Sequence, residues 1–158
     1  MKKYIFMAII AIASVFNAYA EQGDVSAAAQ FVYASKHSMA GLGLQVQYEP
    51  ITNWRLAPEF LYFFKDDGLS ALNVNLNVHY IIQTSNSVAI YPLVGFSYGH
   101  YMVDTPIGDA SDDHCGANVG LGAQYQIKPK LYFFTEERFQ IMKDFNQSVT
   151  VLGLKYTF

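Results

Sequence analysis

Residues 149–158 of the sequence read VTVLGLKYTF, and their pattern is the clearest indication of the fold class. Every second position is large and apolar, from Leu152 and Leu154 to Tyr156 and Phe158, while smaller or polar residues lie between them. Alternation with a period of two predicts a β-strand whose two faces meet different surroundings. The segments upstream are therefore expected to contain strands of the same kind.

The first twenty residues predict a cleaved secretory signal peptide. Lys2 and Lys3 precede an apolar run over residues 4–16, and an A-x-A motif ends at Ala20. Cleavage there leaves residues 21–158 as one domain of an exported protein. Lys2 and Lys3 are removed with the signal peptide. The mature chain therefore carries 8 basic and 13 acidic residues, a formal charge of −5. A chain this acidic is not expected to bind nucleic acid.

The mature sequence contains eight strand candidates. The clearest covers residues 70–82, where leucine, valine and tyrosine alternate with asparagine and histidine. Such lengths suit tilted membrane strands of about 9–11 residues. The eight candidates are residues 24–34, 39–49, 54–64, 70–82, 87–100, 115–127, 130–142 and 147–158.

The polar faces of these strands are rich in glycine, asparagine and glutamine and poor in the lysine and glutamate that solubilise a water-exposed surface. Small and amide side chains suit the crowded lumen of a small barrel, with the apolar faces turned to lipid. The single cysteine, Cys115, excludes an internal disulfide. The expected lipid-facing aromatic belt is Tyr48, Trp54, Tyr62, Tyr80, Tyr98, Tyr125, Tyr156 and Phe158.

The connections predict the orientation of the barrel. Tight turns at residues 50–53, 83–86 and 128–129 lie at the same end as both termini, which we expect in the periplasm. Of the connections at the opposite end, only residues 101–114 are predicted to form a long loop, as outward loops of such barrels do.

Strand alternation also predicts a charged lumen. Buried charges persist when they are paired and hydrogen-bonded, so three acids and three bases favour a self-neutralising network that fills the barrel. A narrow channel along the same network is the alternative. The predicted lumenal charges are Glu49, Arg55, Glu59, Glu136, Arg138 and Lys155.

Glu137 departs from this pattern. Strict alternation turns its carboxylate toward lipid near the middle of its strand, which is costly. We expect a β-bulge that turns both Glu136 and Glu137 inward; the alternative is a position nearer the outer headgroups.

The sequence contains a short internal repeat. Residues 43–48 match residues 120–125, and Glu59 then aligns with Glu136. Together with the terminal Phe158, this pattern resembles the small porin-like outer-membrane β-barrel family of the OmpX and OmpA membrane-domain type. The resemblance implies an all-β fold, an eight-stranded antiparallel up-and-down transmembrane barrel, and a non-enzymatic role in membrane integrity or surface interaction.

The resemblance also implies the partners. These are outer-membrane lipids and lipopolysaccharide, periplasmic chaperones, and the barrel-assembly machinery, for which Tyr156 and Phe158 are the recognition signal. The barrel is expected to be a monomer.

Other small outer-membrane barrels modify lipids, so enzyme activity needs consideration. His37 and Ser38 are adjacent and point to opposite sides, His79 has no serine in phase on its strand, and His100 and Ser97 lie on different faces. No nucleophile–base pair results, and we expect no catalytic residues and no cofactor. The acidic residues of segment 104–114 match no EF-hand spacing, and we expect no metal site.

Overall fold

The computed structural model describes residues 23–36, 38–66, 69–105, 108–142 and 146–158. The predicted signal peptide lies outside these residues. Within the described part of the chain, no helix is long and apolar enough to cross a membrane.

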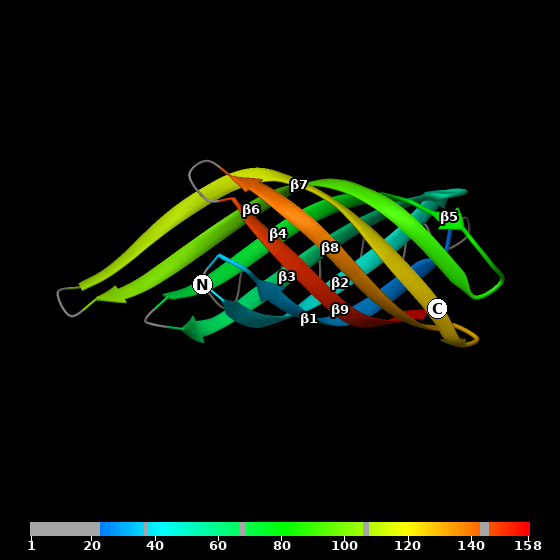
Figure 1. The fold of residues 1–158 in the computed structure, drawn as a ribbon, viewed down its shortest axis with the longest axis horizontal. Helices are drawn as coiled ribbons and strands as arrows, with labels where there is room; N and C mark the ends of the chain where they lie inside the picture. The colour runs from blue at the N-terminus through cyan, green and yellow to red at the C-terminus, as the bar shows by residue number, and fades with distance from the viewer. Residues whose placement is uncertain (1–22, 37, 67–68, 106–107, 143–145) are drawn as a thin grey trace.

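Eight long strands form a closed antiparallel barrel (Figure 1), as the sequence predicted. Neighbours in sequence pair with each other, β4 pairs with β6, and β1 pairs with β9 to complete the ring. A short extra strand, β5, pairs with the beginning of β6; its first residue was predicted to end the preceding strand and its second to begin a turn. The strands are β1 (Val25–Ala34), β2 (Met39–Ile51), β3 (Trp54–Asp66), β4 (Leu69–Tyr80), β5 (Ile82–Gln83), β6 (Val88–Thr105), β7 (Gly108–Lys128), β8 (Leu131–Met142) and β9 (Gln147–Thr157).

The β1–β9 seam closes the barrel without irregularity. Its ladder is continuous from Ser26, opposite Thr157, to Ala34, opposite Val149. On β9, Leu152, Leu154 and Tyr156 face outward and are about half exposed, whereas the residues between them are buried. The alternation read from the sequence therefore separates the outer surface of the barrel from its lumen.

The residues of the expected aromatic belt all lie on the outer surface, in two groups. Tyr62 and Tyr98 lie toward the end of the barrel that is remote from the carboxyl terminus, hereafter the far end. The near end holds the other group, where Trp54 and Tyr80 meet edge to face at 5.2 Å between ring centroids. That group is Tyr48, Trp54, Tyr80, Tyr125, Tyr156 and Phe158.

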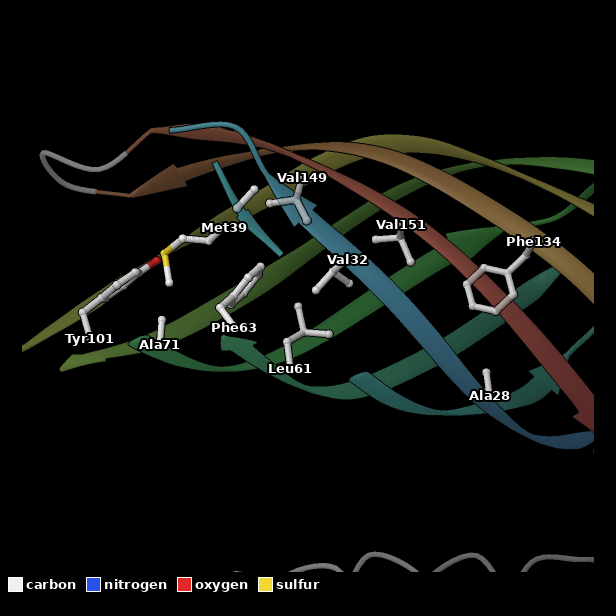
Figure 2. Close-up of a cluster of buried hydrophobic side chains, with 11 residues drawn as sticks. Ala28, Val32, Met39, Leu61, Phe63, Ala71, Tyr101, Phe134, Val149 and Val151 are labelled. Atoms are coloured by element: carbon white, nitrogen blue, oxygen red, sulfur yellow. The ribbon is translucent and has the colours of Figure 1, made fainter. Parts of the chain in front are cut away.

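The lumen is polar only in part. From the far end toward the middle it is filled by buried apolar side chains from seven strands, which we call the apolar plug (Figure 2). The polar network expected from the sequence fills the remainder. The described residues of the plug are Ala28, Val32, Ala34, Met39, Leu61, Phe63, Ala71, Tyr101, Phe134, Val149 and Val151.

The prediction of a long loop at residues 101–114 is wrong. β6 and β7 continue as a hairpin, paired from His100 and Asp113 out to Thr105 and Gly108, and this hairpin extends beyond the rest of the barrel (Figure 1). The aspartates suggested a loop, yet two antiparallel strands satisfy each other's backbone groups whatever their side-chain polarity.

The predicted bulge at Glu137 is also wrong. The β7–β8 register runs without a shift past Glu136 and Glu137, so Glu137 faces outward. Ser148 donates to one of its carboxylate oxygens and Thr150 to the other, at 2.6 Å from Thr150 Oγ1. Hydroxyl groups on the neighbouring strand thus satisfy the carboxylate without any change of register.

The glycines of the lumenal face make room for large side chains. A Cβ atom at Gly122 would overlap the ring of Tyr91, which is fully buried. We therefore expect Gly122→Ala to lower the free energy of unfolding by about 1–3 kcal/mol through overpacking. Urea unfolding of the refolded barrel measures the loss. The neighbouring outward substitution Ala123→Val is the control, and an equal loss in both variants would contradict the explanation.

Candidate functional site

The centre of the lumen is organised around the carboxylate of Glu59 on β3. Its Oε2 accepts hydrogen bonds from Gln30 at 2.7 Å and Gln45 at 3.3 Å. Its Oε1 accepts from Asn75 at 2.7 Å and Asn77 at 3.3 Å. Amide side chains from β1, β2 and β4 therefore converge on one buried charge, which explains the repeated asparagine and glutamine on the inner faces.

Arg138 on β8 supplies the positive charge for this centre. Its Nη1 forms an ion pair with Glu59 Oε1 and lies 3.7 Å from Glu136 Oε2. All three side chains are buried, so the pairing occurs where water screens it least. Removing one member would leave a buried charge uncompensated.

A stacked pair of rings connects this centre to the near end. His79 lies on Tyr91 with ring centroids 4.7 Å apart and planes at 13°. The Tyr91 hydroxyl donates to Glu136 Oε1 at 3.0 Å, and the Arg55 guanidinium lies 5.6 Å from the Tyr91 ring centroid. Tyr91 thus contacts charged residues of both halves of the network.

The second half of the network lies at the near end. Arg55 donates to Glu49 Oε1 through Nε at 2.9 Å and Nη2 at 2.6 Å. Its Nη1 donates to Gln124 Oε1 at 3.0 Å, and Lys155 Nζ donates to the same oxygen at 3.0 Å. Two cations therefore share one neutral acceptor.

The six predicted lumenal charges thus all face inward, but in two clusters rather than one. Glu59, Glu136 and Arg138 form the central cluster, and the other three form the cluster at the near end. Sequence reasoning missed Tyr91 and His79, which connect the clusters. Their inward phase could be read from strand alternation, but their stacking depends on β4 and β6 being neighbours.

Among the described residues, several buried polar atoms have no protein hydrogen-bond partner. They include both ring nitrogens of His79 and both amide atoms of Asn73. Buried groups of this kind generally bind ordered water. These atoms lie along the polar part of the lumen, which is therefore where ordered water is expected.

Two histidines outside the lumen contact aspartate side chains on the projecting hairpin. His100 Nδ1 lies 2.6 Å from Asp113 Oδ1, and His114 Nε2 lies 3.3 Å from Asp112 Oδ2. His37 lies outside the described residues. No group of three or more histidine, cysteine, aspartate or glutamate side chains in the described structure could hold a metal ion.

The central ion pair should dominate stability. We expect Arg138→Met to lower the free energy of unfolding by about 3–5 kcal/mol, because Glu59 would remain buried without a cation. Adding Glu59→Gln should recover part of this loss. Urea unfolding of the single and double variants measures the coupling, with Lys128→Met on the surface as the control. Strictly additive losses would contradict the pairing.

Comparison with known proteins agrees with the geometry. A family model described as an outer membrane protein beta-barrel domain matches residues 5–158. A search of curated proteins finds no match.

Several solved structures are similar in fold. The N-terminal β-barrel domain of Pseudomonas aeruginosa OprF shares 15% identity and a TM-score of 0.72, over 87% of this chain and 100% of that one. Neisserial surface protein A shares 18% identity and a TM-score of 0.69, over 86% and 97%. Ail, the attachment invasion locus protein of Yersinia pestis, shares 16% identity and a TM-score of 0.65, over 86% and 97%. Ail was also solved with the heparin analogue sucrose octasulfate. At these identities the similarity shows the fold alone.

Proposed function

Since the chain belongs to the outer membrane protein β-barrel family, we propose that it is a non-enzymatic envelope protein that makes contacts outside the membrane through its β6–β7 hairpin. The observation that carries this proposal is the projection of the hairpin beyond the barrel. β4 pairs with β6 only as far as Val103, and β8 pairs with β7 only from Gly116, within the described residues.

The hairpin presents a strand edge. Within the described part of the chain, residues 108–112 of β7 pair with β6 alone, so their other edge is open to a further strand. An extended segment of another protein can add to such an edge through backbone hydrogen bonds. Exposed edges are commonly protected by charge, and here the protecting charge is acidic.

The charge of the hairpin selects the partner. Residues 101–114 contain four aspartates and no lysine or arginine. The side chains of Asp112 and Asp113 are 76% and 57% exposed, so the hairpin offers negative charge to its surroundings. A basic extended segment is therefore the chemistry that fits. A polyanion such as the heparin analogue found with Ail is not.

The orientation that this role requires has both termini in the periplasm, with the far end outside the cell. Short turns join the strands at the near end, as at Ile51 and Trp54 and at Lys128 and Leu131, whereas the long hairpin is at the other end. That asymmetry is typical of outer-membrane barrels. Cleavage after Ala20 would produce the exported form.

The terminal strand supports recognition by the barrel-assembly machinery. Phe158 is 69% exposed, and its ring meets that of Tyr156 edge to face, with centroids 5.6 Å apart. Both rings are on the outer surface at the near end, where another protein can reach them. A monomeric barrel in contact with lipid and lipopolysaccharide needs no further chain to complete it.

A hairpin that recognises basic segments should bind polylysine. In zwitterionic detergent at low salt, we expect the refolded protein to bind immobilised polylysine and not heparin. Replacing the hairpin aspartates by asparagine should weaken this binding about tenfold, because exposed charge steers association and is screened by salt. The substitutions are Asp104→Asn, Asp109→Asn, Asp112→Asn and Asp113→Asn.

The matched control removes acids at the β3–β4 and β8–β9 connections. Asp66→Asn, Asp67→Asn and Asp144→Asn should leave polylysine binding nearly unchanged. Equal weakening in the control, or equal binding of heparin by the unaltered protein, would contradict recognition by the hairpin.

The alternative function is a narrow channel, and the apolar plug argues against it. An ion that follows the charged network from the near end would have to lose its hydration between Leu61, Phe63 and Val149, which are buried in the plug. We expect no conductance steps from the barrel in planar bilayers. Steps that disappear with Glu59→Gln or Arg138→Gln would instead support the channel.

A further inference from the structure

A polar cavity of about 180 Å³ opens into the near end of the lumen, and the projecting hairpin does not contribute to it. We propose that this cavity binds a small oxyanion, that is, a phosphate or carboxylate group presented at the near end of the barrel. The residues that carry the proposal are Arg55, Gln124, Gln126, Tyr132 and Lys155, all in the cavity wall.

Lys155 is the key group because it is a buried cation without an anionic partner. The residue is 3% exposed, and no carboxylate of the described residues lies within ion-pair distance of its ammonium group. Its Nζ donates to Gln124 and lies 4.5 Å from the ring centroid of Tyr132. A buried ammonium group is stable only when its charge is compensated, and a neutral amide oxygen compensates it in part.

The nearby carboxylate of Glu49 does not serve as a counterion for Lys155, because it pairs with Arg55. Two of the Arg55 nitrogens bind Glu49, which therefore serves the guanidinium, and the third binds the Gln124 oxygen that Lys155 also uses. The remaining acid of the cavity wall is Asp24, which is exposed. The interior of the cavity thus has an excess of positive charge, while its acids are neutralised or lie at the rim.

The wall also supplies hydrogen-bond donors. The Tyr132 hydroxyl accepts from Gln126 Nε2 at 3.2 Å, which leaves its own hydrogen available. Gln124 uses its oxygen for two cations, so its amide nitrogen has hydrogens to donate, and Lys155 uses one of its three. Among the described residues, none of these hydrogens has an acceptor. Several donors around a cation are the arrangement that binds an oxyanion through charge-assisted hydrogen bonds.

The dimensions agree with a small ligand. A water molecule occupies about 30 Å³ of liquid, so the cavity holds one phosphate or carboxylate group together with a few water molecules. A metal cation would be repelled by Arg55 and Lys155, and the Glu49 carboxylate of the wall is already paired with Arg55. The site is independent of the proposed hairpin function, since the two lie at opposite ends of the barrel.

Nuclear magnetic resonance of the refolded mature chain in zwitterionic detergent tests the site. Inorganic phosphate is titrated against chloride at constant ionic strength, and acetate is titrated in a second series. We expect saturable shifts of the amide signals of Gln124, Tyr132 and Lys155, with a dissociation constant on the order of 1 mM. The anion that binds more tightly identifies the group. Shifts that fail to saturate with both anions would overturn the proposal.

Variants separate this site from general attraction to positive charge. Lys155→Met should weaken binding at least about tenfold, the loss expected for a charge-assisted hydrogen bond. Lys128→Met removes an exposed lysine at the same end and should leave binding unchanged. Equal weakening by both lysine substitutions would overturn the proposal.

A more conservative variant tests the site in case Lys155→Met does not fold. Tyr132→Phe keeps the ring beside Lys155 and removes only the hydroxyl donor, and it should weaken binding about threefold. The gel mobility of unheated samples verifies that each variant is folded. Unchanged binding in folded Tyr132→Phe, or in folded Lys155→Met, would exclude the cavity as the site.

Discussion

The constraint on which the structure depends is that a sheet inside a membrane can leave no backbone edge unpaired. Lipid offers no hydrogen bonds, so the strands must close into a ring, and here β1 and β9 complete it. Closure determines where each side chain points, because every strand then has one face toward lipid and one toward the lumen. Beyond the membrane the constraint no longer applies. The β6–β7 hairpin extends past the closed ring, and its residues 108–112 pair with β6 alone within the described part of the chain.

Closure produces a second requirement, which is that the narrow lumen must be filled. The chain meets it with three groups of side chains: the apolar plug, a central cluster around Glu59 and Arg138, and a more open cluster around Arg55 and Lys155. The internal repeat of the sequence has a structural consequence in the central cluster. Its two equivalent glutamates, Glu59 and Glu136, approach the same guanidinium from different strands. The plug makes the lumen a packed interior, whereas the cluster at the near end retains a polar cavity.

The errors of sequence reasoning have a common cause. Glu137 and the aspartates of residues 101–114 were judged by their own polarity, whereas their positions depend on neighbouring strands. Ser148 and Thr150 satisfy Glu137 across the β8–β9 ladder, and β6 and β7 satisfy each other beyond the barrel. The plug was missed for a similar reason. Val32 and Val151 share the inward phase of Gln30 and Lys155, but only the pairing of β1 with β9 shows that the two valines meet.

Sequence alone determined the fold class, the outward aromatic residues and the inward phase of six charges, because strand alternation assigns each residue to one of two faces and needs no knowledge of its neighbours. Tertiary structure decided which inward residues meet. The convergence of four amides on Glu59, the stack of His79 on Tyr91, and the oxygen shared by Arg55 and Lys155 each join residues from different strands. These contacts depend on the register between strands and on the diameter of the ring. Both are set by the pairing of distant segments, which no local pattern encodes.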